Sequence, residues 1–265
     1  MRTLLICHKG AELHEDGIAR WLAAESELCG IVLLDEPPKA TWRRAKREIK
    51  RSGWLGFVNV MAFRLYYRLR LAAPDATWLA GRLTKLQQWY PAVPASVPVL
   101  RVPSPNNDRT KEFIEQCQPD VTVALCKVIL KPYIFTIPTD GTFVFHPGIC
   151  PEYRNAHGCF WALAQRDLER VGMTLLRIDE GVDTGPVYGF FSYPYDEIQE
   201  SHIIIQNRVV LDNLDGLMAK LRDVHTKHAE QIDTTGRASA VWGQPKLTNY
   251  LRWKRAAKRR ARNNA

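Results

Sequence analysis

The chain of 265 residues lacks the features that would place it in several special classes. No apolar run approaches the roughly 20 residues that span a bilayer, which excludes a transmembrane protein. The apolar stretch at the start is too short for a signal peptide, so we expect a cytoplasmic protein. There is no internal repeat, and the only low-complexity segment is a basic C-terminal tail. Hydrophobic residues make up 46% of the chain, which excludes disorder as its main state.

Cysteine and histidine show no metal-binding spacing. The cysteines form no CxxC pair, and several lie in apolar, strand-like runs, so we predict reduced, buried thiols. His225 and His228 are three residues apart near the end of a predicted helix, but no third ligand follows at helical spacing. We therefore expect no metal. The cysteines are Cys7, Cys29, Cys117, Cys126, Cys150 and Cys159.

Acidic residues are almost missing from two segments. Residues 37–70 contain ten basic residues and one acid, Glu48, and residues 246–265 contain eight basic residues and no acid. Because the whole chain carries +9, the remaining body is acidic. The two blocks either bind RNA or another polyanion, such as a nucleotide or an acidic lipid, or form solvated helix faces. Aromatic residues interleave with the first block, which suits base stacking, a membrane surface or helix packing equally.

The hydrophobic pattern predicts an α/β fold with an open, mostly parallel sheet. A strand, a helix and a second strand open the chain, and residues 40–90 then interrupt the alternation with two or three basic helices ended by Gly53 and Pro74. We predict a catalytic domain over 1–195 with a basic helical insertion over about 37–90. Residues 196–265 are expected to form a helical extension with a basic tail, beginning with one long helix over 201–224. The other expected strands cover 98–102, 121–126, 142–145, 171–178 and 186–193.

The most informative segment is Phe143–Gly158, in which an apolar strand ends on His146 and a loop with proline and glycine follows. Ligands of open α/β sheets bind beyond the carboxyl ends of strands, so a titratable residue there is well placed for chemistry. A histidine that only caps the loop is the alternative.

Asp183 lies in a glycine-flanked loop between two predicted strands. A carboxylate beside an imidazole fixes its tautomer and raises its pKa, as in proton-shuttling pairs. Spacing alone does not show that Asp183 meets His146.

The stretch from Gln118 to Gly189 resembles the catalytic core of the folate-dependent formyltransferases, the family of methionyl-tRNA formyltransferase and glycinamide ribonucleotide formyltransferase. The family pattern is roughly N-x-H-P-[SG]-x-x-P-x-[YF]-[RK]-G, followed by G-x-T and D-x-G-x-D-x-G. Matching residues are His146-Pro147-Gly148, Pro151, Tyr153-Arg154, Gly172-Met173-Thr174 and Asp179-Glu180-Gly181-Val182-Asp183-Thr184-Gly185.

The resemblance implies a Rossmann-like domain that uses 10-formyltetrahydrofolate as donor. It also implies that His146 and Asp183 are two of three catalytic residues. Residues implied to line the pterin pocket are Val128, Ile129, Leu130, Asp179, Glu180, Gly181 and Val182.

The chain departs from the family at Val144, where the family has a catalytic asparagine two positions before the histidine. Residues i and i+2 of a strand face the same side, so Val144 takes the place of the amide beside His146. Losing one oxyanion donor typically costs about 100- to 1000-fold in rate. Lys127, Asn155, His157 and Thr174 are candidates for substrate contact or for a replacement donor; Asn155 itself stands where the family usually has glycine.

We therefore expect a formyltransferase, a one-carbon group transferase that acts on the amine of a small molecule such as an amino sugar or an amino acid derivative. Hydrolysis of formyltetrahydrofolate and ligand binding by a pseudoenzyme are the alternatives. A tRNA acceptor is less favoured, because the residues after Tyr195 read as helices rather than as the additional barrel of the tRNA enzyme. Self-association into a homo-oligomer stays open.

Overall fold

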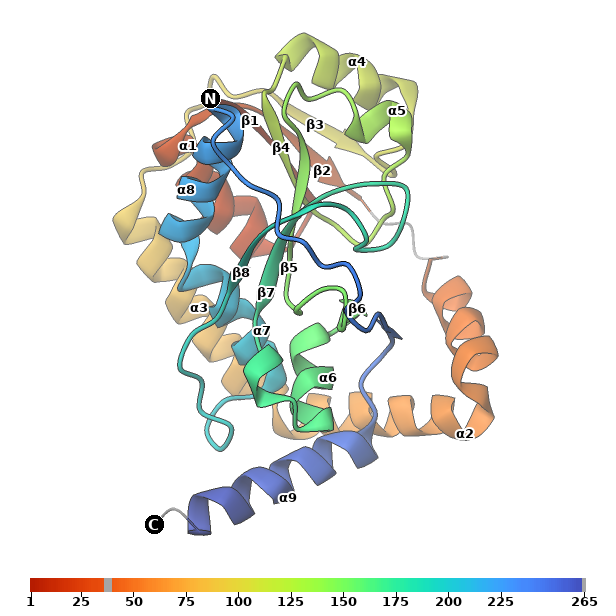
Figure 1. Cartoon of the computed structure of the whole chain (residues 1–265). Coiled ribbons are helices and arrows are strands. Elements are labelled where there is room, and N and C mark those ends of the chain that lie inside the picture. Colours follow the sequence, from red (N-terminus) through yellow and green to blue (C-terminus); the bar gives the residue numbers. More distant parts are fainter. Residues whose placement is uncertain (36–39, 264–265) are drawn as a thin grey trace.

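The computed structural model describes residues 1–35 and 40–263 and contains a seven-stranded sheet of order β3-β2-β1-β4-β5-β7-β8 (Figure 1). Neighbouring strands from β3 to β5 are parallel, and β7 and β8 run antiparallel at one edge. The predicted fold class is confirmed: the sheet is open and mostly parallel, with helices on both faces. The strands are β1 (Arg2–His8), β2 (Glu27–Leu34), β3 (Val99–Val102), β4 (Val121–Leu125), β5 (Gly141–His146), β7 (Met173–Arg177) and β8 (Val187–Phe191).

The central strands read as continuous apolar runs because both of their faces are covered. Side chains alternate between the faces, so Leu5 and Cys7 of β1 join one buried cluster while Leu4 and Ile6 join another. The second cluster is closed by α4 (Asp108–Cys117) and the short α5 (Pro132–Phe135). The first is larger and is covered by the π-helical turn η1 (Leu13–Ile18), α1 (Ala19–Glu25), α3 (Ala72–Trp89), α6 (Gly158–Gln165), α7 (His202–Leu211) and α8 (Leu214–His225).

The predicted insertion forms α2 (Ala40–Arg70) and α3. Residues 37–39 of the insertion and of the first basic block lie outside the described part. Gly53 separates two helical segments of α2, as predicted: its φ of 70° and ψ of 174° leave the helical region, so the chain kinks there. Pro74 sits in the first turn of α3, where its missing N–H costs no helical hydrogen bond. Among the described helices, α2 included, none is long and apolar enough to cross a bilayer.

The single long helix predicted over 201–224 is wrong: α7 and α8 are separate. Ser201 caps α7 by accepting hydrogen bonds from two backbone N–H groups of its first turn. At the break, the Asn213 side chain donates to the carbonyl groups of Val209 and Ser192, which replaces helical bonding with local side-chain bonding. The remaining elements are β6 (Arg154–Asn155), the 3-10 turn η2 (Leu168–Arg170), β9 (Val241–Trp242) and α9 (Leu247–Asn263).

Residues beyond Tyr195 pack into the same core as the sheet. Ile205 of α7, Leu217 of α8 and Trp253 of α9 all belong to the large cluster. The division of the chain at residue 195 into two domains stays a prediction.

The cysteines agree with the expectation from the sequence. The six cysteines, all in the described part of the chain, form no disulfide, and five are buried. Burial raises the pKa of the Cys7 and Cys159 thiols to about 12, so both are protonated near neutral pH.

Candidate active site

His146 is the last residue of β5, at the carboxyl edge of the parallel strands, and only 5% of it is exposed. Its ring makes two contacts. Nε2 lies 2.7 Å from the Tyr153 carbonyl oxygen, and Nδ1 lies 3.4 Å from Oδ2 of Asp183. The sheet edge therefore brings together the two residues that spacing alone could not connect.

Asp183 reaches His146 because the loop between β7 and β8 folds back toward the carboxyl edge. Oδ1 of Asp179 accepts hydrogen bonds from the Gly181 N–H (2.9 Å) and the Thr184 hydroxyl (2.7 Å) and so closes the loop on itself. Arg154 Nη1 donates to the Val182 carbonyl (3.2 Å) and ties the loop to the segment after His146. Asp183 has a φ of 51°, a conformation that few non-glycine residues adopt.

Two glycines allow the loop after His146 to pack tightly. A Cβ on Gly148 would lie 2.8 Å from Nε2 of His146, and a Cβ on Gly158 would lie 2.4 Å from the Cα of Gly148. Thr174, the register partner of His146 on β7, donates its hydroxyl to the Gly148 carbonyl (2.7 Å) and accepts from the Cys150 N–H (2.9 Å). The Thr174 hydroxyl proton is therefore engaged in holding the loop.

Asn155 takes part in the site through its backbone. Its N–H donates to Oδ2 of Asp183 (2.7 Å), and its side-chain amide donates to the Trp242 carbonyl. Its φ of 75° is the left-handed conformation that explains why glycine is usual at this family position. Because the side-chain amide is already bonded, Asn155 is poorly placed to replace the missing amide of Val144.

The C-terminal segment closes over this loop, which the local sequence pattern did not indicate. β9 pairs with β6, so Trp242 lies beside Asn155. The Trp242 ring stacks on Trp161 with centroids 4.8 Å apart and on Tyr153 with centroids 5.8 Å apart. A strand of two residues carries almost no periodic signal, so the sequence pattern does not predict this pairing.

Lys127 and His157, two of the candidate donors, differ in charge and exposure. Desolvation lowers the pKa of His157 to about 4, so its imidazole is neutral near pH 7. Lys127 follows β4 and is exposed, and its positive charge contributes to the lowered pKa of both His157 and His14. Its backbone N–H donates to Nε2 of His8 (3.0 Å). The Lys127 side chain therefore brings a cation to the carboxyl edge.

Val144 points to the same side of β5 as His146 but packs in an apolar cluster. That cluster is built from Cys150, Leu176 and Val187, with Leu176 opposite Val144 in the ladder. Val144, at the strand position where the family has an asparagine, is thus part of a small hydrophobic cluster.

The segments predicted to line a pterin pocket approach one another around one apolar cluster. Val128 and Ile178, the residue before Asp179, both pack against the cluster that contains buried Leu130, while Ile129 is 61% exposed. Asn106 fixes this segment by donating its side-chain amide to the Ile129 carbonyl (2.9 Å).

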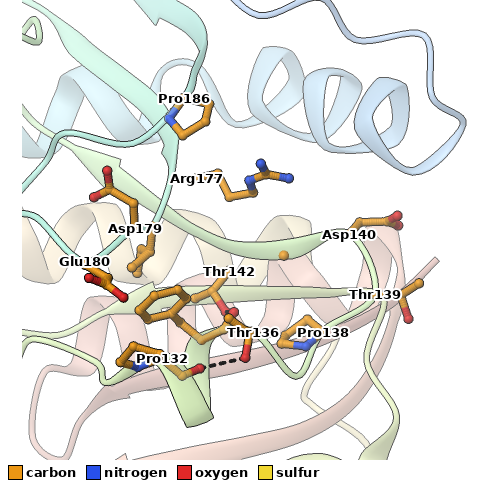
Figure 2. A pocket seen from close by; sticks show the side chains of 13 residues that line it. Pro132, Thr136, Pro138, Thr139, Asp140, Thr142, Arg177, Asp179, Glu180 and Pro186 are labelled. Atoms are coloured by element: carbon orange, nitrogen blue, oxygen red, sulfur yellow. Dashed lines mark hydrogen bonds between the residues drawn. The ribbon is translucent and has the colours of Figure 1, made fainter.

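Asp179 and Glu180 also line a hollow of about 430 Å³ near the start of β5 (Figure 2). His146 and the segment 128–130 do not line it. Figure 2 shows Arg177 and Pro186 on one side and Pro132 and Thr136 on the other. A ligand in this hollow would lie at the opposite end of β5 from His146.

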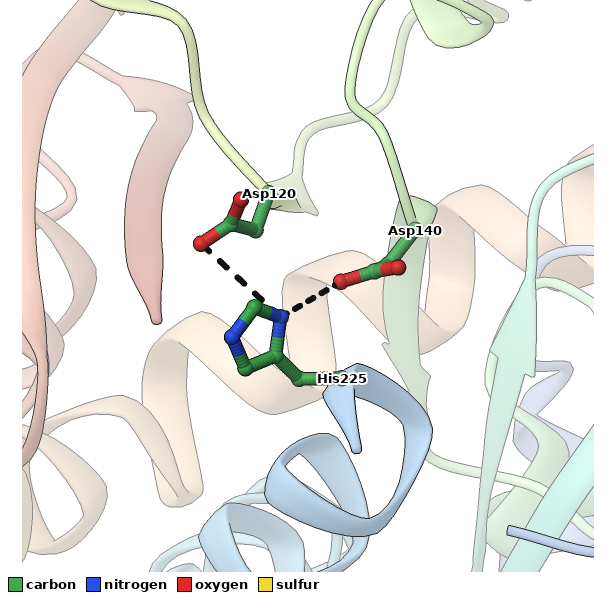
Figure 3. A group of neighbouring side chains, drawn as sticks. All are labelled: Asp120, Asp140 and His225. Carbon is green, nitrogen blue, oxygen red and sulfur yellow. Dashed lines mark hydrogen bonds and ion pairs between the residues drawn. The ribbon is translucent and has the colours of Figure 1, made fainter. Parts of the chain in front are cut away.

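Asp120, Asp140 and His225 form a separate polar cluster at the amino ends of β4 and β5 (Figure 3). Nδ1 of His225 lies 2.8 Å from Oδ2 of Asp140, and Lys227 pairs with the other oxygen of Asp140. The Lys227 ammonium group already pairs with the buried Asp140 carboxylate. We therefore interpret the cluster as a clamp that holds the end of α8. His225 is thus in contact with carboxylates, and His228 bonds the Thr226 hydroxyl.

Among curated proteins, the chain is similar to methionyl-tRNA formyltransferases over part of its length. The methionyl-tRNA formyltransferase of Microcystis aeruginosa is 36% identical over 98 residues, which are 36% of this chain and 30% of that protein. The methionyl-tRNA formyltransferase of Sorangium cellulosum is 30% identical over 183 residues, or 63% of this chain and 54% of that protein. The chain thus spans between about a third and half of the length of these relatives.

Solved structures share the fold at low identity. A sugar N-formyltransferase from Shewanella sp. aligns with a TM-score of 0.56 and 13% identity over 97% of this chain and 87% of that chain. Phosphoribosylglycinamide formyltransferase from Anaplasma phagocytophilum aligns with a TM-score of 0.55 and 12% identity, covering 92% and 99%. The formyl transferase family model matches residues 73–219, more than half of the sequence. The chain belongs to the formyl transferase family.

Proposed function

We propose that the protein transfers a formyl group from 10-formyltetrahydrofolate to the primary amine of a small molecule. The observation that carries this proposal is the contact between His146 and Asp183, 3.4 Å apart, at the carboxyl edge of a formyl transferase fold. This distance is just beyond direct hydrogen-bond range, about 2.6–3.2 Å, so in this proposal a small approach of the two side chains or one bridging water completes a proton-carrying pair.

The residues that would hold the donor fit a flat heteroaromatic ring. Val128 and Ile129 supply apolar surface over the buried Leu130, and the neighbouring loop after Ile178 supplies backbone groups for hydrogen bonds. When bound, the donor supplies an electrophilic formyl carbon on nitrogen. We assign the pterin ring to this place rather than to the hollow beyond Asp179, which lies far from His146 along β5.

His146 has the proton-transfer role in this proposal. The amine must lose a proton as its nitrogen bonds to the formyl carbon, and the donor nitrogen must gain one as the old C–N bond breaks. His146 can move that proton, since the Asp183 carboxylate stabilises the imidazolium and fixes the ring orientation. At rest, Nε2–H donates to the Tyr153 carbonyl and Nδ1 faces Asp183. In this proposal the ring leaves the Tyr153 carbonyl, carries its own proton on Nδ1 toward Asp183, and takes the amine proton at the bare Nε2.

We infer that Lys127 replaces the amide that Val144 lacks. Of the four candidates, Thr174 and Asn155 use their donors within the loop, and His157 is neutral because desolvation lowers its pKa. Lys127 alone among these brings a positive charge to the edge where negative charge develops on the formyl oxygen.

Activity assays with 10-formyltetrahydrofolate test the function directly. Formyl transfer to pooled amino sugars and amino acid derivatives is expected, with little consumption of donor when no amine is added. Donor consumption without amine would identify a hydrolase, and formylation confined to methionyl-tRNA would identify the reaction named for the sequence relatives.

Variants test the assigned roles. His146→Ala should lower the rate by about 100- to 10,000-fold, and Lys127→Met by about 100- to 1000-fold. His228→Ala is the control, because His228 is exposed, its ring bonds the Thr226 hydroxyl, and it lies in the turn after α8, away from His146. Val144→Asn should change the rate modestly if Lys127 serves as the donor. A large gain on Val144→Asn, with no effect of Lys127→Met, would reject Lys127 and indicate a site that lost its activity with the asparagine.

A further inference from the structure

The second part of α2 exposes a continuous apolar stripe. From Leu55 on, its members recur every three or four residues, the spacing of one helix face, and Trp54 adjoins Leu55 at its start. Two of them are among the most exposed apolar side chains described, Leu55 at 89% and Leu69 at 70%. The stripe consists of Trp54, Leu55, Val58, Met61, Leu65 and Leu69.

The opposite side of the same helix explains why α2 holds its place. Val60 and Phe63 are buried, and the Phe63 ring packs on Phe160 of α6 with centroids 5.8 Å apart. Asn59 and Thr248 exchange hydrogen bonds that join α2 to α9. The helix is therefore fixed to the body by one face while its apolar stripe points away.

Basic side chains flank the stripe, and the sequence around it contains no acidic residue. No Asp or Glu occurs from Ile49 to Pro74. Arg64 and Arg68 are exposed and precede Leu65 and Leu69 by one residue, about 100° around the helix. The neighbouring α9 buries Tyr250, Trp253, Ala256 and Ala257 and exposes Arg252, Arg255, Lys258, Arg259 and Arg262.

Figure 1 shows α2 and α9 lying together along one side of the molecule, next to α6, the helix that follows the His146 loop. The helix that carries the apolar stripe and the helix that carries the exposed basic side chains are thus neighbours, joined by the hydrogen bonds between Asn59 and Thr248.

We propose that this side, formed by α2 and α9, docks on a membrane surface that contains anionic lipid. Aliphatic side chains with a tryptophan on one helix face, flanked by arginines, are the composition of helices that lie in the plane of a bilayer. The stripe enters the acyl boundary, and the Arg and Lys side chains pair with lipid phosphates. This inference is independent of the proposed reaction.

Two other occupants fit less well. A second copy of this chain would place the arginines of α2 and α9 opposite their own equivalents, where like charges repel. RNA would use the positive charge, but bases stack on aromatic rings, and five of the six stripe side chains are aliphatic.

Vesicle co-sedimentation of the full chain tests the proposal. The wild type should bind vesicles of three parts phosphatidylcholine to one part phosphatidylglycerol at least tenfold more strongly than vesicles of phosphatidylcholine alone, and less strongly as salt rises. Leu55→Glu/Leu65→Glu should weaken binding to the anionic vesicles more than tenfold. Trp89→Glu/Val99→Glu is the matched control: its two positions are 60% and 50% exposed and lie outside α2, so binding should change less than twofold.

Further measurements separate the alternatives. Quenching of Trp54 fluorescence by brominated acyl chains, lost in Trp54→Phe, would place the stripe in the lipid. No binding of the wild type to anionic vesicles, or equal loss in both double variants, overturns the proposal. So does binding of a single-stranded RNA oligonucleotide that survives Leu55→Glu/Leu65→Glu without any vesicle binding. A dimer in sedimentation velocity that only Leu55→Glu/Leu65→Glu abolishes would assign the stripe to a second copy instead.

Discussion

Asn155 combines two roles in the loop around His146. Its backbone adopts the left-handed conformation and presents an N–H to Asp183, and its side chain fastens the loop to Trp242. Asparagine tolerates this conformation better than most residues with a Cβ. The change from glycine at this position is therefore compatible with the backbone and adds a contact to the C-terminal segment.

Asn155→Ala should lower the free energy of unfolding by about 2 kcal/mol, since left-handed strain in alanine costs about 1 kcal/mol and the lost hydrogen bond about 1 kcal/mol. Asn155→Gly avoids the strain and should be the more stable of the two variants by about 1 kcal/mol. Urea unfolding of both variants measures the difference. Equal stability of the two would show that the backbone conformation contributes nothing.

The polar clamp at the amino ends of the parallel strands joins four elements, β1, β4, β5 and α8. Asp120 precedes β4 and accepts a hydrogen bond from the Arg2 N–H of β1, while Asp140 precedes β5. Both face His225 at the end of α8, and Lys227 follows two residues later. These contacts hold the last turn of α8 against the amino ends of two parallel strands.

Asp140→Ala should destabilise the protein by about 1–3 kcal/mol, because it leaves His225 and Lys227 without their shared acceptor. The exposed Glu230→Ala should change stability by less than about 0.5 kcal/mol and serves as control. If the clamp holds no metal, EDTA should leave the thermal midpoint of the wild type unchanged. A fall in that midpoint, restored by a divalent cation, would assign a metal to the cluster.

Four helices meet at a buried group of rings. His202 of α7 is 2% exposed and lies among Phe63 of α2, Phe160 of α6 and Tyr250 of α9, with ring centroids 5.3–6.4 Å away. Among the described residues its Nδ1 has no hydrogen-bond partner. Burial lowers the pKa of His202 well below its usual value, so the ring is neutral in the folded protein.

This lowered pKa makes the whole molecule sensitive to acid. Below about pH 6.5 the unfolded chain takes up a proton at His202 that the folded chain does not, so stability falls as pH falls. Urea unfolding from pH 7.5 to pH 5 should show this loss, and His202→Phe should reduce it while keeping the ring packing. An identical pH dependence in His202→Phe would show that other groups are responsible.

The sequence by itself determined the fold class and the most informative loops. Apolar runs bounded by turns predicted most strands, because burial on both faces leaves a clear local signal. The order of residues around His146 and Asp183 also identified the family, since those loops use short motifs with strict backbone demands. Local spacing could not establish the contact between the two residues.

Only the tertiary structure decided the contacts between distant segments. β9 reaches the His146 loop across more than 80 residues, and a two-residue strand has no periodicity to announce it. The break between α7 and α8 depends on Asn213 bonding to Ser192 of a neighbouring segment, so the helical pattern alone missed it. For the same reason, the sequence alone could not show which apolar residues of α2 face solvent. Packing against α6 and α9 determines which of them are buried and which form the exposed stripe.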